Sequence, residues 1–323
     1  MTLDDFLDEW NSLEDTVMVH TSGSTGMPKP MRVEKKRMLN SARITCDFLG
    51  LKAGDTALLC MPLDYIAGKM VVVRSIERHL RLISVEPSGH PLKDVMTPVD
   101  FAAMVPMQVY NSMQVPEERE KLRAIRHLII GGGGVNDDLQ QQLAFFPNYV
   151  WSTYGMTETL SHIALRRLNG EEASLWYTPF DSVGVSLNAK GCLVIDAPLV
   201  HEGRLETHDR AEICDGKFRI IGRLDNVINS GGIKIQAEEV EKALHPYLNA
   251  PYLISKCKDE KFGEVVVFLT ECADLCLMRS VCCSVLPKFW QPKHYFYTPH
   301  IPLTDTGKPA RKEAENLCRM KLE

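Results

Sequence analysis

The chain has 323 residues, a formal net charge of −5, and 45% hydrophobic and 24% charged residues. This length is enough for a large domain and a smaller one. The negative charge gives no electrostatic reason to expect a nucleic acid or an anionic membrane as a partner. No apolar run approaches the roughly 20 residues of a membrane span, and the acidic, amphipathic start "MTLDDFLDEW" is unlike a targeting peptide. We therefore expect a cytoplasmic globular protein without a membrane span.

The ten cysteines are scattered along the chain, and no C-x-x-C pair occurs among them. Paired spacings would be needed for a zinc site or a disulfide framework. We therefore interpret the cysteines as small buried hydrophobes of a protein in a reducing compartment, and we expect no tightly bound metal.

Strands alternate with helices through the first half of the sequence. Such alternation predicts an α/β fold with a parallel sheet and helices, here as a large N-terminal domain. After residues 1–10, a short helix, and 16–20, a strand, the expected elements are a helix (33–51), strands (55–62 and 81–87), a strand passing into a helix (101–113), a strand, glycine turn and helix (125–146) and a strand entering a polar turn (148–159).

The pattern changes near residue 160, where short apolar segments follow one another closely. These segments predict a mainly antiparallel β subdomain, and the tail predicts a separate small, mobile α+β domain beginning near Asp225. The expected domains are therefore 1–224 and 225–323. The short strands are predicted at 162–168, 173–179, 182–187, 192–198, 204–213 and 217–225, and the tail elements at 237–247 (helix), 264–271 (strand), 273–286 (helix) and 292–320 (strand, loop and helix).

The first unusual segment is "VHTSGSTGMPKP", which directly follows the strand at 16–20. Four hydroxyls, two glycines and a lysine suit a loop whose backbone N–H groups and side chains surround an anion. The Walker A spacing is absent, so this is a different kind of phosphate loop. The expected phosphate-binding residues are Thr21, Ser22, Gly23, Ser24, Thr25, Gly26 and Lys29.

Four further segments accompany this loop in a fixed order. They are "STYGMTET" (152–159), "RLETHDRAEI" (204–213), "GRLDNVINSGGIKIQAEEVE" (222–241) and "PLTDTGKPAR" (302–311). Together with "TSGSTGMPK" they resemble the core motifs of the adenylate-forming superfamily, which includes acyl-CoA synthetases. The resemblance implies that a carboxylic acid and ATP, with Mg²⁺, form an acyl-adenylate and pyrophosphate, and that the thiol of coenzyme A then displaces AMP.

The same resemblance assigns roles to individual residues. Thr157 lies near the phosphates, Glu158 binds Mg²⁺, and Lys308 contacts the reacting carboxylate and α-phosphate. The segment "GGGGV" (131–135) fails the dinucleotide pattern because Asn136 stands where the last glycine belongs, and it corresponds to a small-residue turn beside the adenine and the acyl group. The expected adenine and ribose residues are Gly132, Gly133, Ser152, Thr153, Tyr154, Gly155, Asp209 and Arg223.

The small domain carries the residues that the resemblance connects with its movement. Asp225 matches the hinge, and Gly231 and Gly232 match the turn that serves thioester formation with coenzyme A. His208 stands where the family has a glycine before the ribose aspartate, which makes the local backbone geometry a point to examine.

The phosphate loop begins at residue 21, so we expect the family's first subdomain to be largely absent, leaving surface that a second copy of the chain could cover. The segment "YIAGKM" is similar to that of short o-succinylbenzoate–CoA ligases of menaquinone biosynthesis. Its acyl-pocket residues would be Tyr65, Ala67, Gly68 and Lys69, with Gly131.

A dicarboxylate with an aromatic ring needs apolar walls and a cation for its spare carboxylate. Lys69, Arg74 and Arg78 lie near the pocket segment, but each by itself is interpreted as a solvated helix-face charge. Two alternatives stay open: a ligase for another aryl or medium-chain acid, and a nucleotide-binding module without catalytic activity.

Overall fold

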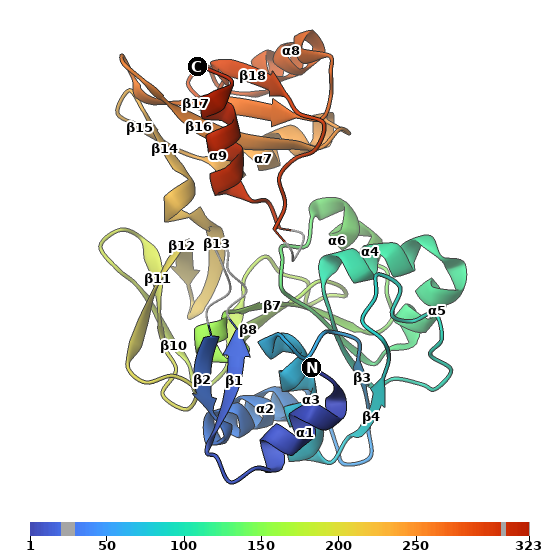
Figure 1. Cartoon of the computed structure of the whole chain (residues 1–323). Helices are drawn as coiled ribbons and strands as arrows, with labels where there is room; N and C mark the ends of the chain where they lie inside the picture. Colours follow the sequence, from blue (N-terminus) through green and yellow to red (C-terminus); the bar gives the residue numbers. More distant parts are fainter. Residues whose placement is uncertain (21–29, 305–307, 323) are drawn as a thin grey trace. The chain divides into compact units, whose positions relative to one another are not determined.

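The computed structural model describes residues 1–20, 30–304 and 308–322, and the chain forms two compact units (Figure 1). The first unit comprises Met1–Ser186, Val194–Leu205 and Ile213–Arg219. The second comprises Leu187–Leu193, Glu206–Glu212 and Ile220–Glu323. The chain therefore passes from one unit to the other several times before residue 220. No helix within the described ranges has the length and apolar character of a membrane span.

A seven-stranded sheet in the order β4-β3-β5-β6-β7-β8-β9 forms the centre of the first unit. Neighbouring strands from β4 to β7 are parallel, whereas β8 is antiparallel to β7 and β9 is antiparallel to β8. The α/β fold with a parallel sheet expected from the sequence is confirmed. The strands are β3 (Thr56–Leu59), β4 (Arg81–Ser84), β5 (Phe101–Met104), β6 (His127–Ile130), β7 (Tyr149–Gly155), β8 (His162–Arg167) and β9 (Thr178–Pro179).

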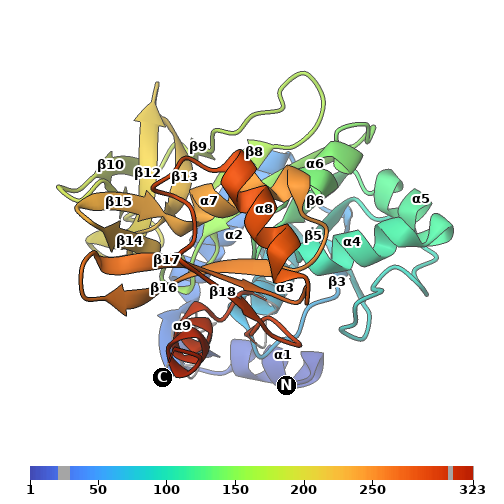
Figure 2. The same ribbon diagram turned by 90° about the horizontal axis from the view of Figure 1, so that it is seen from above.

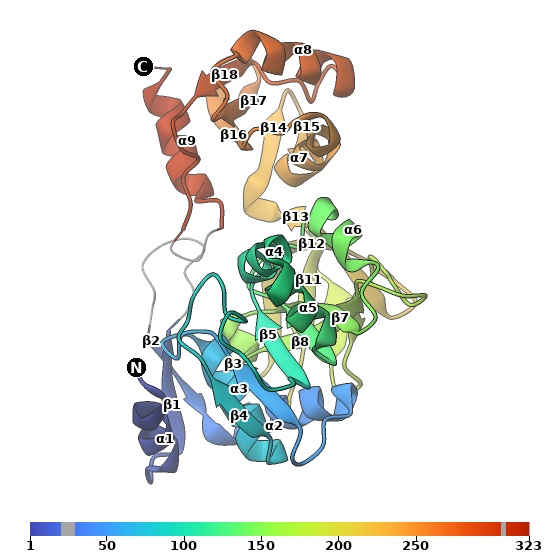
Figure 3. The same cartoon turned by 90° about the vertical axis from the view of Figure 1, so that its right-hand side faces the viewer.

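The inner strands are buried along their whole length because helices cover both faces of a parallel sheet. Every residue of β3, β5 and β6 is buried, which explains the continuous apolar runs "TALL" and "FAAM". In Figures 1 and 3, α2 and α3 lie beside each other, apart from the group of α4, α5 and α6. These helices are α2 (Lys35–Leu49), α3 (Ile66–Arg78), α4 (Pro106–Gln114), α5 (Pro116–Ala124) and α6 (Asp137–Leu143).

The N-terminal segment forms helix α1 (Leu3–Asn11) and the antiparallel pair β1 (Thr16–His20) and β2 (Pro30–Glu34). Thr2 caps α1 by accepting a hydrogen bond from the backbone N–H of Asp5, whose carboxylate accepts from the N–H of Thr2 in return. His20 pairs with Pro30 across the two strands. The predicted phosphate loop, residues 21–29, lies outside the described residues.

The prediction of one β subdomain after residue 160 is partly wrong. β8 and β9 extend the main sheet, and the strand expected at 173–179 is only two residues long. The Ser174 hydroxyl accepts a hydrogen bond from the N–H of Trp176, so this segment turns locally instead of pairing. The later strands do form a separate four-stranded sheet: β10 (Gly184–Leu187), β11 (Cys192–Asp196), β12 (Arg204–Cys214) and β13 (Lys217–Arg223).

A five-stranded sheet with helices on both faces forms most of the second unit. α7 and α8 pack on one face over Val266 and Phe268, and α9 packs on the other over Val267 and Leu269 (Figures 2 and 3). The elements are β14 (Val227–Ser230), β15 (Ile233–Gln236), α7 (Ala237–Leu244), β16 (Tyr252–Asp259), β17 (Gly263–Thr270), α8 (Leu275–Val285), β18 (His294–Tyr297) and α9 (Arg311–Met320).

The substitution Gly68→Ala tests how closely α3 approaches the preceding loop. Helix propensity alone would make this change stabilising by about 0.5–1 kcal/mol. However, a Cβ at Gly68 would lie 2.4 Å from the carbonyl oxygen of Pro62, which is backbone. We expect the clash to dominate and lower the free energy of unfolding by about 1–3 kcal/mol, measured by urea denaturation. Gly134→Ala, where a Cβ meets open space, is the control; equal effects of both changes would contradict this account.

Candidate active site

The glycine turn after β6 and the polar end of β7 lie side by side in the first unit. β6 and β7 are parallel, with Ile130 opposite Ser152, so their carboxyl ends share one edge of the sheet. A Cβ on Gly131 would lie 2.4 Å from the Thr153 hydroxyl oxygen. The next residue, Gly132, has a φ of +77°, a conformation that favours glycine. Gly131 and Gly132 are therefore required for the turn to stay against β7, and Gly133 continues it.

Tyr154 belongs to an aromatic cluster that the sequence did not reveal. Its ring centroid lies 5.1 Å from that of Phe218, edge-on, and 5.9 Å from that of Tyr177. Tyr177 stacks on Phe218, and its hydroxyl is 2.9 Å from the Ser152 hydroxyl. Tyr177 and Phe218 come from segments distant in sequence from β7, and neither lies in a recognisable motif. The cluster supplies the flat apolar surface on which an adenine can stack.

Two of the predicted catalytic side chains lie in the turn after β7 and differ in burial. Thr157 is buried, whereas Glu158 in the same 3₁₀ turn is exposed. Gly155 precedes the turn, and a Cβ there would lie 2.3 Å from the Ser161 carbonyl oxygen. Among the residues that the structure describes, no three His, Cys, Asp or Glu side chains cluster as a metal site. Glu158 could thus offer Mg²⁺ one carboxylate, with the remaining ligands coming from phosphates and water.

The interpretation of Lys69 and Arg74 as solvated charges is wrong. Both side chains are only 2% exposed, because the α3 face that carries them packs inward. The Lys69 ammonium donates to the Met18 carbonyl oxygen at 2.5 Å, lies 3.4 Å from the Glu9 carboxylate and sits over the Phe6 ring. Lys69 is therefore engaged by the N-terminal segment.

Arg74 and Arg78 differ in the charges that surround them. Arg78 is partly exposed and pairs with the carboxylates of Asp47 and Glu77. Arg74 donates to the Ser161 hydroxyl at 2.5 Å and lies over the Phe101 ring at 5.9 Å, and its buried Nε has no hydrogen-bond partner in the described part of the chain. Burial lowers the pKa of Arg74 to about 10, so the guanidinium stays charged near neutral pH.

The other predicted acyl-pocket residues lie at the start of α3. Tyr65 precedes the helix and forms an isolated parallel bridge with His20, the last residue before the predicted phosphate loop. Ala67 is exposed, and Gly68 is buried against the loop at 61–62. The pocket segment and β1 are therefore neighbours within the first unit.

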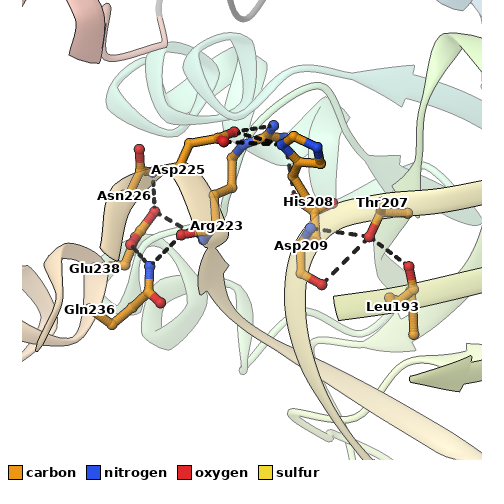
Figure 4. Close-up of polar contacts among 9 residues, drawn as sticks. All are labelled: Leu193, Thr207, His208, Asp209, Arg223, Asp225, Asn226, Gln236 and Glu238. Atoms are coloured by element: carbon orange, nitrogen blue, oxygen red, sulfur yellow. Dashed lines mark hydrogen bonds and ion pairs between the residues drawn. The ribbon is translucent and has the colours of Figure 1, made fainter. Parts of the chain in front are cut away.

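In the second unit, the predicted ribose aspartate, Arg223 and the predicted hinge aspartate form a continuous charge network (Figure 4). Arg223 bridges two carboxylates, at 3.2 Å from Asp209 and 3.0 Å from Asp225. His208 adds a further contact, with its Nδ1 3.0 Å from Asp225. His208 lies within β12, which stays a continuous strand, so the histidine in place of the family's glycine does not interrupt the backbone.

Gln236 and Glu238, at the start of α7, hold the backbone of Arg223. The Gln236 amide donates to the Arg223 carbonyl oxygen at 2.8 Å and to the Glu238 carboxylate at 2.5 Å (Figure 4). The other oxygen of Glu238 accepts from the Asn226 amide at 2.5 Å. A Cβ on Gly222 would lie 2.6 Å from Gln236, so this contact also requires glycine. Gln236 and Glu238 were not among the predicted site residues, although both lie in the matching motif.

Lys308 shares the electrostatic environment of this network. Burial lowers its pKa from the ordinary value, the positive charge of Arg223 lowers it further, and Asp209 raises it. The Lys308 N–H donates to the Thr304 hydroxyl, and its carbonyl oxygen accepts from the Thr304 N–H at 2.7 Å. Asp209, Arg223 and Lys308, although widely spaced in sequence, thus come together in one unit.

The predicted coenzyme A turn is a two-residue hairpin loop between β14 and β15. Gly231 and Gly232 have φ values of +57° and +85°, and Ser230 pairs with Ile233 across the loop. Both central residues of such a tight hairpin take positive φ, which explains the two glycines. A Cβ on Gly231 would also lie 3.1 Å from the Phe262 ring.

The interpretation of the cysteines as buried hydrophobes is correct for only some of them. All ten are free, and six are buried. Cys214, Cys276 and Cys283 are exposed, and Cys272 is intermediate. Cys214 ends strand β12, and Cys276 and Cys283 lie on α8, where spacing alone gives no sign of burial.

The sequence signature of the family described as AMP-binding enzyme matches residues 5–214. The chain belongs to this family. A solved structure described as an acyl-CoA synthetase (AMP-forming)/AMP-acid ligase II-like protein, from Dyadobacter fermentans, is 33% identical, with a TM-score of 0.66 over 99% of this chain and 93% of that one. Both comparisons agree with the family resemblance of the motifs.

Curated relatives of the chain carry a more specific name. The 2-succinylbenzoate–CoA ligases of Salmonella typhimurium and Haemophilus influenzae are 26% and 27% identical over 90% and 83% of this chain. The chain spans 66% and 62% of the lengths of these two relatives. A solved o-succinylbenzoate CoA synthetase from Bacillus subtilis, 22% identical with a TM-score of 0.77, shares the fold.

Asp225 gives a pH-dependent prediction. Burial alone would raise the pKa of Asp225, but hydrogen bonds from His208 and Arg223 outweigh it and hold the pKa below its ordinary value. A depressed carboxyl pKa stabilises the fold above the ordinary carboxyl range, and this stabilisation is lost as the pH falls. Asp225→Asn should therefore reduce the loss of unfolding free energy between about pH 7 and about pH 3, by less than about 1 kcal/mol because the half-exposed pair is screened.

The measurement is urea denaturation at both pH values, with Asp181→Asn, an exposed aspartate, as the control. An unchanged pH dependence in Asp225→Asn would contradict the role of the network in stability.

Proposed function

We propose that this protein is an ATP-dependent acid–CoA ligase that first forms an acyl-adenylate and then a CoA thioester, with o-succinylbenzoate as its acid. The observation that carries the chemistry is the grouping of Asp209, Arg223 and Lys308 in one electrostatic environment. A carboxylate with an adjacent guanidinium suits a ribose with two hydroxyls. A partly buried lysine suits a reacting carboxylate and phosphate, because a cation in a low-dielectric site stabilises developing negative charge more strongly.

The first unit by itself also carries groups suited to a nucleotide. The aromatic cluster of Tyr154, Tyr177 and Phe218 is suited to the adenine, and the glycine turn at 131–133 lets backbone approach the ligand closely. Glu158 is an oxygen ligand suited to Mg²⁺, which when bound with ATP would neutralise phosphate charge. The Gly231–Gly232 turn is proposed for the thiol step.

The proposal of a dicarboxylate acid rests on Arg74. This buried guanidinium has no carboxylate partner within the described residues, unlike Arg78, and it lies over the aromatic ring of Phe101. An unpaired buried cation costs several kcal/mol unless an anion binds to it. The spare carboxylate of o-succinylbenzoate would provide that anion. The curated relatives named 2-succinylbenzoate–CoA ligase support the same substrate.

The partners in this proposal are therefore the carboxylic acid, ATP and coenzyme A, in the cytoplasm. Menaquinone biosynthesis is the pathway that the substrate implies. A second copy of the chain as a partner stays a prediction from the sequence.

An acid panel tests the substrate. We expect pyrophosphate release from ATP and Mg²⁺ with o-succinylbenzoate, followed by a CoA thioester detected by mass spectrometry. Benzoate, succinate, phenylpropionate and a medium-chain fatty acid should each be at least about 10²-fold less effective, because an unfilled charged site is costly. Activity with another acid alone would keep the ligase chemistry and discard the substrate; ATP binding without any activity would favour the binding-module alternative.

The substitution Lys308→Ala tests the division of work within the second unit. We expect adenylation to fall by roughly 10²–10³, by analogy with the loss of one donor to a developing oxyanion. Conversion of supplied acyl-adenylate to the thioester should be retained, since that step is assigned to the glycine turn at 231–232. The two half-reactions are measured separately, with Lys312→Ala on the exposed side of α9 as the control. Equal loss of both half-reactions in a folded variant would refute this division.

A further inference from the structure

A chain of hydrogen bonds continues from Arg74 into the core of the first unit. The Arg74 guanidinium contacts the Ser161 hydroxyl at 2.5 Å, and that hydroxyl lies 3.2 Å from Nδ1 of His162. The other ring nitrogen, Nε2, lies 3.1 Å from the hydroxyl of Thr45 in α2. Thr45 in turn contacts the Ser41 carbonyl oxygen at 3.1 Å. None of the residues in this chain of hydrogen bonds, from Ser161 to Ser41, belongs to the five sequence motifs.

The last contact fixes the direction of every hydrogen bond in the chain. A carbonyl oxygen can only accept, so the Thr45 hydroxyl donates its single proton to Ser41. Thr45 must then accept from His162, which places the proton of a neutral imidazole on Nε2 and makes Nδ1 an acceptor. The Ser161 hydroxyl therefore donates to Nδ1, and its lone pairs face Arg74. Each donor along the path meets an acceptor.

The burial of His162 keeps the ring in the neutral form that this chain requires. His162 is 8% exposed. Burial, and secondarily the positive charge of Arg74, hold the pKa of His162 well below its ordinary value. The cation and the neutral ring are thus compatible, whereas a protonated ring would have no acceptor for the Ser161 proton.

Backbone geometry holds the centre of the chain in place. Gly155 lies so close to the segment that a Cβ there would be 2.3 Å from the Ser161 carbonyl oxygen and 2.4 Å from the Cα of His162. Leu160, immediately before Ser161, has a φ of +66°, which is rare for a residue other than glycine. Ser161 therefore has little freedom to move, and the orientation of its hydroxyl is set by its hydrogen bond to His162.

We propose that His162 and Thr45 are positioning residues that hold the Ser161 hydroxyl as an acceptor and thereby orient the Arg74 guanidinium for a carboxylate of the acid substrate. This inference rests on the proposed function, because it assigns the role of the spare-carboxylate site to Arg74. It makes selection for a dicarboxylate depend on two residues that need not touch the acid.

The test compares kcat and KM of the full chain for o-succinylbenzoate and for 4-oxo-4-phenylbutanoate, which lacks the ring carboxylate. His162→Phe removes the acceptor while keeping an aromatic ring, and we expect KM for o-succinylbenzoate to rise roughly five- to a hundredfold, the range for an unsatisfied buried polar group. Neither kcat nor the KM for the monocarboxylate should change by more than about twofold, since the Arg74 contact is missing there.

Conservative variants separate positioning from structural support. His162→Asn keeps an acceptor near the Nδ1 position and should restore most of the selectivity, and Thr45→Val should weaken it because the tautomer is no longer fixed. Ser75→Ala, which removes a buried hydroxyl of α3 that bonds to Val71, is the matched control. Thermal melting identifies any variant that does not fold, and Thr45→Val then replaces His162→Phe as the deciding variant.

Equal rises in KM for both acids, or no rise for o-succinylbenzoate, would overturn the proposal. If wild type activates no acid, the proposed function fails, and the inference is then decided by the shift in melting temperature that o-succinylbenzoate causes. A shift in wild type that His162→Phe loses and His162→Asn keeps would support it; equal shifts in all three proteins, or none in wild type, would overturn it.

Discussion

The parallel pairing of β5, β6 and β7 is the constraint on which the first unit depends. It aligns the carboxyl ends of these strands, so the residues that follow each strand reach the same edge of the sheet. The glycine turn at 131–133, Tyr154 and the turn with Thr157 and Glu158 all lie at this edge. Because both faces of the inner strands are covered, a shift of register would move each buried side chain to the opposite covered face and disrupt its packing. The position of the candidate site is therefore fixed by the same packing that stabilises the unit.

Arg74 in the first unit and Arg223 in the second differ in burial, and they therefore differ in how they can bind a ligand. Arg74 is fully buried, its contacts are a hydroxyl and an aromatic ring, and it retains unused donor capacity. Arg223, by contrast, is partly exposed and already bridges two carboxylates. A partly exposed ion pair contributes little to stability but can be exchanged for a ligand at low cost. A buried cation without a counter-charge lowers the stability of the fold. The presence of such a cation at Arg74 is therefore the stronger indication that a side chain binds a ligand.

Glycine appears in the predicted site for three distinct physical reasons. Gly131 and Gly155 are required because neighbouring atoms leave no room for a Cβ. Gly231 and Gly232 form a hairpin loop that needs positive φ at both positions. Gly68 lets α3 approach backbone oxygens. The sequence shows a glycine in each case and does not distinguish these three reasons. Substitutions at these positions are therefore unfavourable for different physical reasons.

The sequence by itself determined the alternation of strands and helices, the five motifs and the residue types of the site, because periodicity, capping residues and motif spacing are local properties. It identified the residues Asp209, Arg223 and Lys308 as candidates. Only the tertiary structure decided that Lys69 and Arg74 are buried, that Tyr177 and Phe218 join Tyr154, and that His162 lies between Ser161 and Thr45. These outcomes depend on which face of a helix packs inward and on contacts between segments more than a hundred residues apart. A short sequence window contains neither kind of information.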